Sequence, residues 1–451
     1  MKIHPNGFTL EEFLLSLSRE RLAVMRHLID CTTCRHRFLG ILHQRSLSKR
    51  TADVLPWPDT PTDYEPAWER SGKVTLDQGR SLEKERQEAP GLFVELMRFP
   101  PEQRDLLVRN SSRFQTWALF ELLIERSFEV GINNPVHAEE LGLLALRLSE
   151  HLDAEHYNAE LIEDLRARAC GYVANSYRLR SDLQRAEETF ASAYGHLLQG
   201  SQDPMEHAIL MDLEASLRRD QRRFEQAFRL LRRAVSIFLR NDQRHRAGRS
   251  LVNLSTVHHY AGNPEQGVPI LFQATELIDP EQEPRLLLCA RHNLIDDLAE
   301  AGRFLEAQRL YQETRPLYRS FPDAWSQNRR KWVKGKIARG MGQAEQAESL
   351  FLAARDGFIA EGIPYDTALV SLELALLYAG EGRMADLKRL AAEMVPIFSS
   401  LHIHREALAA LAYLKQAVET EQASLDLING IAAYLRRAQY DPALRFEVPE
   451  E

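Results

Sequence analysis

Two stretches of this sequence, GRFLEAQRLYQETR at residues 302–315 and GQAEQAESLFLAAR at residues 342–355, share one pattern of small and apolar residues. The pattern recurs along the chain, and each copy begins 40 or 41 residues after the one before it. The same position of each copy is marked by a small or apolar residue at Ala186, Ala227, Gly267, Ala307, Ala347 and Leu387. A fixed period of this length is the signature of a repeat architecture, so it decides the fold class.

The spacing within each copy predicts two helices. Phe351 and Ala354 follow Ala347 at four and seven positions, which places the three residues on one face of a helix. A second small or apolar residue precedes each marker by twelve positions, at Ala174, Ala215, Ser255, Ile295, Gly335 and Ala375. We call the helix with this earlier residue the first helix of a pair, and the helix with the marker the second. One pair cannot bury its apolar face alone, so neighbouring pairs are expected to stack.

Glycine-containing breaks separate the two helices of a pair. They read AGN at 261–263, AGR at 301–303, GMGQ at 340–343 and GEGR at 380–383. Glycine adopts the left-handed conformation that ends a helix without steric penalty, so each break is expected to end a first helix.

The repeat resembles the tetratricopeptide repeat, in which small residues let two helices of a pair approach closely. The first copy matches best: if it starts at Ala167, Ala174, Tyr177, Ala186 and Phe190 fall at positions typical of that family, as does Ala193. The period of 40 exceeds the 34 residues usual in the family, which implies longer helices or loops. The resemblance covers about residues 167–400 and implies an all-α, right-handed solenoid of helix pairs.

Composition and breakers divide the rest of the chain. Pro56, Pro58, Pro61 and Pro66 lie in a stretch without periodicity that is typical of a linker. The predicted organisation is a small helical zinc-binding module, a Pro-rich linker with a connecting helix, a helical extension of the solenoid, six helix pairs, a degenerate capping pair and a tail, at residues 1–48, 49–90, 91–166, 167–400, 401–440 and 441–451.

Composition favours a globular protein of the cytoplasm. The chain has 451 residues, 44% of them hydrophobic, and a formal charge of −8, which argues against broad binding of nucleic acid. No run of apolar residues is long enough for a membrane span, and Glu11 and Glu12 precede the first short apolar run, so no secretory signal is expected. Four cysteines are too few for a disulfide framework.

The stretch HLIDCTTCRHRF at residues 27–38 is the exception to an ordinary composition, because His27, Cys31 and Cys34 are spaced four and three residues apart. On one straight helix, His27 and Cys34 would be about 10 Å apart along the axis. A shared metal therefore requires a break near Asp30, with a second helix that begins at the cysteines. A module of this size is too small to be stable on its hydrophobic core alone, and a structural zinc would stabilise it.

The same stretch resembles the zinc-binding motif of anti-sigma factors, a His, three residues, a Cys, two residues and a Cys. That family takes its fourth ligand from a residue about two dozen positions upstream, which here is His4; His36 or a water are the alternatives. The competing interpretation is a packed helix face of small thiols and a histidine. Redox chemistry is disfavoured because no thioredoxin-like pattern surrounds the cysteines.

No enzymatic motif is present: the chain lacks a glycine-rich phosphate loop, a Gly-x-Ser-x-Gly elbow and a His-Glu-x-x-His pair. We therefore expect a protein-interaction scaffold or adaptor. In tetratricopeptide repeats the first helices line a concave groove. Carried over to this register, the resemblance implies a set that we call the first-helix face: Arg168, Asn175, Arg178, Arg219, Arg249, His259, His292, Arg329, Trp332, Lys336 and Arg339.

Arginines dominate this set and could clamp carboxylates, so an acidic or extended peptide segment is the expected ligand. The plainer interpretation is that these arginines are ordinary solvated helix residues. Two alternative functions remain: a cytoplasmic anti-sigma-like transcription regulator that binds zinc and a sigma factor, and a peptide-sensing regulator.

Overall fold

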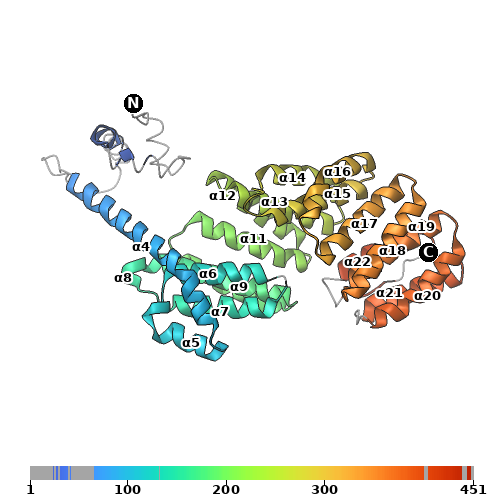
Figure 1. The fold of residues 1–451 in the computed structure, drawn as a ribbon, viewed down its shortest axis with the longest axis horizontal. Helices are drawn as coiled ribbons and strands as arrows, with labels where there is room; N and C mark the ends of the chain where they lie inside the picture. Colours follow the sequence, from blue (N-terminus) through green and yellow to red (C-terminus); the bar gives the residue numbers. More distant parts are fainter. Residues whose placement is uncertain are drawn as a thin grey trace, which may run out of the picture. The chain divides into compact units, whose positions relative to one another are not determined.

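The computed structural model describes residues 24, 27–28, 31–38, 41, 65–131, 133–400, 405–438 and 444–447. Within these ranges every regular element is a helix, which confirms the all-α prediction (Figure 1). The chain forms two compact units. Unit 1 holds the described residues up to Arg180 together with Glu188–Glu206 and Leu239–Asp242, and unit 2 holds Ser181–Glu187, His207–Phe238 and the described residues from Gln243 onward.

The helices follow the predicted alternation along the chain. In order, they are α4 (Glu65–Met97), α5 (Pro101–Asn110), the 3-10 turn η1 (Ser112–Phe114), α6 (Trp117–Val130), α7 (Pro135–Ser149), α8 (Ala154–Tyr157), α9 (Ala159–Leu179), α10 (Leu183–Gln199), α11 (Pro204–Asp220), α12 (Phe224–Arg240), α13 (Arg244–Tyr260), α14 (Pro264–Leu277), α15 (Pro284–Glu300), α16 (Phe304–Arg319), α17 (Ala324–Gly340), α18 (Ala344–Ala360), α19 (Pro364–Gly380), α20 (Met384–Ser400), α21 (Arg405–Glu419) and α22 (Leu425–Ala438).

Unit 2 contains the most regular repeats. Helices α13 to α19 pack consecutively, each against the next, and first helices α13, α15, α17 and α19 also contact one another. The residues that mark the repeat are buried: Ala307 and Ala347 are fully inaccessible, and so are Phe351 and Ala354. The 40-residue pattern therefore reports the contacts between helices, as predicted.

The breaks between paired helices also have the predicted geometry. Gly302 and Gly342 have φ angles of 72° and 73°, in the left-handed region. In the two earliest pairs the equivalent positions are Ser181 and Arg222, which adopt φ of 62° and 60° without being glycine. These two turns could not be predicted from residue type, because serine and arginine do not require that conformation.

Unit 1 is built from α4 to α9, with α6 and α7 forming a pair and α9 packed on α7. Gly142 on α7 permits this close approach, since a Cβ atom there would lie 2.8 Å from Cγ2 of Val173 on α9. Helix α4 runs through residues 90 and 91, where the sequence placed a domain boundary, and it begins at Glu65 within the stretch taken as linker. Pro66 fits because proline is tolerated in the first turn of a helix.

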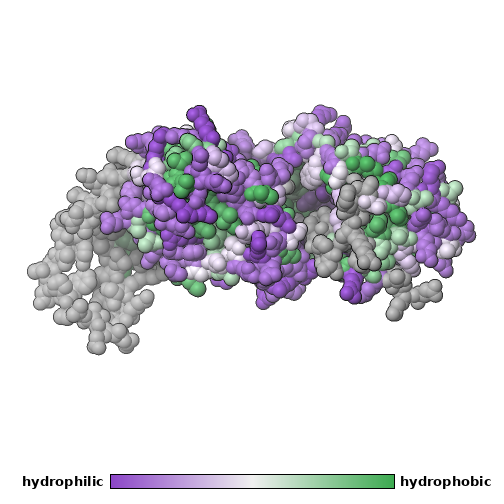
Figure 2. Space-filling view, turned by 90° about the horizontal axis from the view of Figure 1, so that it is seen from below, coloured by the Kyte–Doolittle hydropathy of each residue, from purple (hydrophilic) through white to green (hydrophobic). Residues whose placement is uncertain are grey.

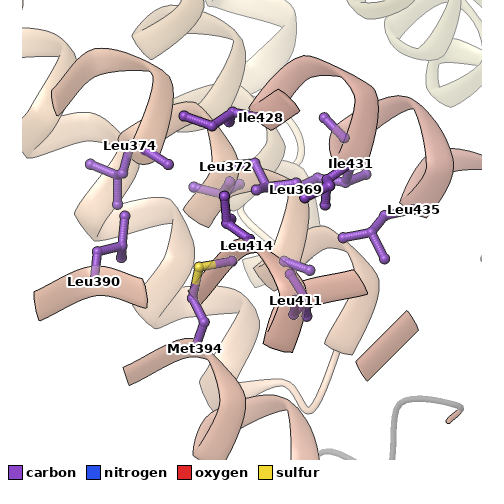
Figure 3. Close-up of a cluster of buried hydrophobic side chains, with 14 of the residues drawn as sticks. Leu369, Leu372, Leu374, Leu390, Met394, Leu411, Leu414, Ile428, Ile431 and Leu435 are labelled. Atoms are coloured by element: carbon purple, nitrogen blue, oxygen red, sulfur yellow. The ribbon is translucent and has the colours of Figure 1, made fainter. Parts of the chain in front are cut away.

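At the C-terminal end of unit 2, the helix α22 packs back onto the earlier helix α19. The predicted capping pair is present as α21 and α22, yet α22 packs more extensively on α19 than on α21. Figure 3 shows Leu369 and Leu372 of α19 beside Ile431 and Leu435 of α22 in one apolar cluster. No helix among the described residues is both long enough and apolar enough to cross a membrane.

Candidate functional site

The first-helix face of unit 2 is a polar network centred on Lys336 of α17. Its Nζ donates to Asp296 Oδ1 and Glu300 Oε1, both at 2.7 Å and both on α15. Glu373 of α19 approaches the same Nζ at 4.0 Å, and Arg339 Nη1 lies 2.5 Å from the other oxygen of Glu373. Lys336 is only 5% exposed. Three neighbouring first helices are thus tied together by charge.

The electrostatics of this cluster favour the ionised forms of Lys336, Asp296 and Glu300. Burial by itself would lower the pKa of Lys336, but the carboxylates of Asp296, Glu300 and Glu373 raise it above its ordinary value. Conversely, the ammonium of Lys336 lowers the pKa of Glu300 to about 2. The pKa of Asp296 also falls below its ordinary range, despite burial, because of the same ammonium. The network is therefore a set of compensated charges.

A second group joins α15, α16 and α17. His292 Nδ1 lies 2.7 Å from the hydroxyl of Tyr318, and Arg329 Nε donates to His292 Nε2 at 3.3 Å. Since the guanidinium can only donate, Nε2 must accept and Nδ1 must carry the proton of a neutral ring. Burial, and then the charge of Arg329, lower the pKa of His292 to about 3, in agreement with that neutral state. Arg329 also lies over the ring of Trp325, 5.1 Å from its centroid.

The remaining predicted residues pair in the same manner. In unit 2, Arg249 forms an ion pair with Glu283, and His259 Nδ1 lies 2.8 Å from Asp297 Oδ1. Arg219 Nε donates to Asp220 Oδ1 at 2.8 Å. In unit 1, Arg168 forms an ion pair with Glu206, and the Nε atom of Arg178 donates to Asn175 Oδ1 at 3.0 Å. Arg168, Arg219 and Arg249 thus pair with carboxylates of the chain, whereas the hydrogen bond of Arg178 goes to a neutral amide.

Sequence reasoning identified most of the cations but missed most of their partners, which include Glu206, Glu283, Asp297, Glu300 and Glu373. It also missed Arg436, a further cation that pairs with Glu300. A signal was available: Arg168 and Glu206 are 38 residues apart, and Arg249 and Glu283 are 34 apart. An acid about one period from a base on the first helices indicates an ion pair between adjacent repeats. Arg436 lies 136 residues from Glu300 and had no such signal.

Trp332 occupies the middle of α17. Trp332 is 8% exposed, and its ring packs edge-to-face on Phe358 with centroids 6.0 Å apart. Lys336 Nζ lies 5.0 Å from the centroid of the Trp332 ring. Its indole Nε1 is buried and has no hydrogen-bond acceptor among the described residues. On the face shown in Figure 2, hydrophilic residues cover most of the described surface, with hydrophobic residues in small groups between them.

The N-terminal cluster lies within the described part of residues 24–41. Residues 27–28 and 32–38 are helical and Cys31 between them is not, which fits the expected break; Asp30 lies outside the described residues. One ligand atom from each of His27, Cys31 and Cys34 lies within 4.8 Å of the others. Cys34 is buried, and burial followed by a hydrogen bond with Cys31 raises the pKa of its thiol. His4 lies outside the described residues, and His36 is exposed and not part of this group.

Comparison with known proteins places this chain among helical-repeat folds. Residues 162–316, fewer than half of the chain, match the family described as SNAP, soluble NSF attachment protein. A search of curated protein sequences finds no match. The solved structure of a Rap protein complexed with competence and sporulation factor is similar with a TM-score of 0.52 at 12% identity, over 71% of this chain and 87% of that one.

A second solved structure, aspartyl phosphate phosphatase F from Bacillus subtilis, aligns over 100% of both chains at 12% identity with a TM-score of 0.45. At these identities the likeness concerns the fold alone. Taken with the paired helices and their 40-residue period, the comparisons support a helical-repeat fold that resembles tetratricopeptide repeats.

Proposed function

We propose that this protein is a non-enzymatic interaction scaffold whose first helices α13, α15 and α17 bind an extended peptide or protein segment. The likeness to a Rap protein solved with competence and sporulation factor supports this proposal, as do the protein-binding roles typical of helical-repeat scaffolds. Stacked helix pairs present a large polar surface rather than a catalytic constellation.

The observation that carries the proposal is the buried indole N–H of Trp332. A buried donor without an acceptor is destabilising by about 1–3 kcal/mol, and a bound group that accepts from this N–H would remove that cost. A peptide carbonyl is such an acceptor. Trp332 also adjoins the compensated charges of Lys336 and its partners.

The ion pairs within the chain narrow the kind of ligand that this face is expected to bind. Because Lys336, Arg249 and Arg339 already bind carboxylates of the chain, a purely acidic ligand would have to compete with them. An extended segment that offers both donors and acceptors suits this face better. A peptide-sensing regulator is the form of this function that the Rap likeness favours.

The test compares full-length wild type with Arg329→Glu and with Arg309→Glu. Arg329 donates to His292, and Arg309 is an exposed control on α16. Affinity purification with quantitative mass spectrometry is expected to lose the wild-type partners, by about tenfold or more, only from Arg329→Glu. Equal partner recovery from both variants, with unchanged thermal midpoints, would overturn the assignment.

We also propose that His27, Cys31 and Cys34 hold a structural zinc, with His4 as the fourth ligand. Zinc binds its ligands at about 2.0–2.3 Å in a tetrahedron, so ligand atoms lie roughly 3.3–3.8 Å apart, and a small contraction of the observed group would reach that geometry. The donors also fit chemically, because thiolates and imidazole are the ligands that zinc prefers. Bound zinc would stabilise the thiolates and hold the two helical segments of the module together.

Elemental analysis of the purified full chain is expected to find about one zinc, lost in Cys31→Ser with Cys34→Ser and retained in Cys170→Ser with Cys289→Ser. A wild type that stays metal-free in zinc-containing buffer, with an unchanged fold, would contradict the site. The same cysteine variants test the anti-sigma-like alternative: loss of a sigma factor from them, but not from Arg329→Glu, would assign the partner to this module.

A further inference from the structure

Helix α22 covers the side of α19 that corresponds, one repeat later, to the first-helix face of α17. The positions of Arg329, Trp332 and Lys336 on α17 correspond, 40 residues later, to Leu369, Leu372 and Leu376 on α19. Opposite them, α22 places three aliphatic residues, Ile428, Ile431 and Leu435, all with no exposed surface (Figure 3). A segment of the chain itself thus lies on the surface that carries the polar network one repeat earlier.

Helix α22 also reaches into the polar network. Arg436 Nη2 donates to Glu300 Oε1 at 3.0 Å, although α15 lies 136 residues earlier in the chain. The same oxygen accepts from Lys336 Nζ at 2.7 Å. At the end of α22, the hydroxyl of Tyr365 donates to the carbonyl of Ala438 at 3.3 Å. An aliphatic stripe followed by a basic residue is therefore the chemistry that this surface accepts.

Several features favour release of α22 over disruption of the repeats. It is the last helix among the described residues, and in a repeat protein each element depends mainly on its neighbours. If Arg436 departs, Glu300 keeps Lys336, so no buried carboxylate loses its only partner. Asn429 and Gly430 are exposed, poor helix formers in the middle of α22, and a Cβ at Gly430 would meet nothing within 4 Å. Tertiary contacts, rather than its own helical propensity, hold α22.

We infer that the surface of α19 and α15 is a docking site for an amphipathic helix, and that α22 is its resident occupant. The partner helix carries aliphatic residues at the spacing of Ile428, Ile431 and Leu435, with a basic residue directly after the last of them. It binds by displacing α22, whose release also opens the adjoining polar face. This inference rests on the proposed function, because it concerns the same set of first helices.

The first test needs no partner. Amide hydrogen exchange of the full chain, followed by mass spectrometry, is expected to show α22 exchanging at least about tenfold faster than α18, which is buried among repeats. Equal protection of α22 and α18 would overturn the inference, since α22 would then be a fixed part of the fold. Such a result would leave the proposed function of α13, α15 and α17 intact.

The second test uses a labelled synthetic peptide of residues 423–438. We expect it to bind the full chain carrying Ile431→Asp at least about tenfold more tightly than the chain carrying Ala433→Asp, because only Ile431 is buried against α19. Within the peptide, Arg436→Glu is expected to weaken binding severalfold and Arg437→Glu to leave it unchanged. Equally weak binding to both chains, when both are folded, would overturn the inference; if Ile431→Asp does not fold, hydrogen exchange of the wild type decides.

Discussion

Helices α17 and α19 occupy equivalent places in successive repeats, yet their first-helix faces have opposite chemistry. On α17, Lys336 is buried among carboxylates from α15 and α19. On α19, Leu369 and Leu372 are buried beneath α22. The same backbone thus accepts either a compensated charge or an apolar stripe, provided that a neighbour supplies the partner. The repeat fixes where a residue lies, and the neighbour determines whether it is tolerated.

The largest expected effect is on the polar side of this comparison. Lys336→Met would remove the cation from a group of buried carboxylates, and breaking a buried ion pair in this way destabilises by about 3–5 kcal/mol. Denaturant unfolding of unit 2, followed by circular dichroism, measures the loss. Lys388→Met is the matched control, because its pair with Glu421 is exposed and is expected to contribute less than about 1 kcal/mol. Similar losses in both variants would break the comparison.

On the apolar side, Leu372→Ala would leave a cavity between α19 and its neighbours. Leu372 has no exposed surface, and such truncations cost about 2–5 kcal/mol, so we expect about 3 kcal/mol. The control Leu305→Ala, at a side chain 70% exposed, is expected to change stability by less than about 0.5 kcal/mol. A small loss at Leu372 would mean that α22 and α19 repack around the smaller side chain.

The two sides are also expected to differ in their response to acid. The folded-state pKa of Glu300 is lowered from 4.5 to about 2, so the stability from its ionisation is present above pH 4.5 and is lost as pH falls toward 2. We expect a contribution of roughly 1–2 kcal/mol after allowing for its partial exposure. Glu300→Gln should therefore have a shallower decline of stability below pH 4.5 than wild type. Leu372→Ala should keep the wild-type slope, and an altered slope there would contradict the separation of the two faces.

The smallest effects test what α17 and α19 share. Gly342 and Gly382 follow them with φ of 73° and 68°, and a Cβ at either site would meet nothing within 4 Å. Gly342→Ala and Gly382→Ala should each destabilise by about 1 kcal/mol, from backbone strain alone. Thermal unfolding of both variants measures this. Clearly unequal losses would show that the two turns are not equivalent.

The candidate sites were predictable to different degrees. The repeat register, set by small residues such as Gly335 and Ala375, predicted the residues of the first-helix face once it was combined with the resemblance to tetratricopeptide repeats. Their pairing could not be predicted in the same way, because Lys336 takes partners from both neighbouring helices. For His27, Cys31 and Cys34, spacing predicted the proximity that the structure has, whereas the metal and the role of His4 stay predictions.

The sequence by itself determined the helix pairs, their 40-residue period and the glycine turns, because these depend on local propensity and on a face that repeats with the helix. Only the tertiary structure decided that α22 turns back onto α19 and that Arg436 reaches Glu300. The physical reason is that a repeat constrains contacts between neighbours one period apart. A contact across 136 residues has no period, so it is specified only when the whole chain is packed.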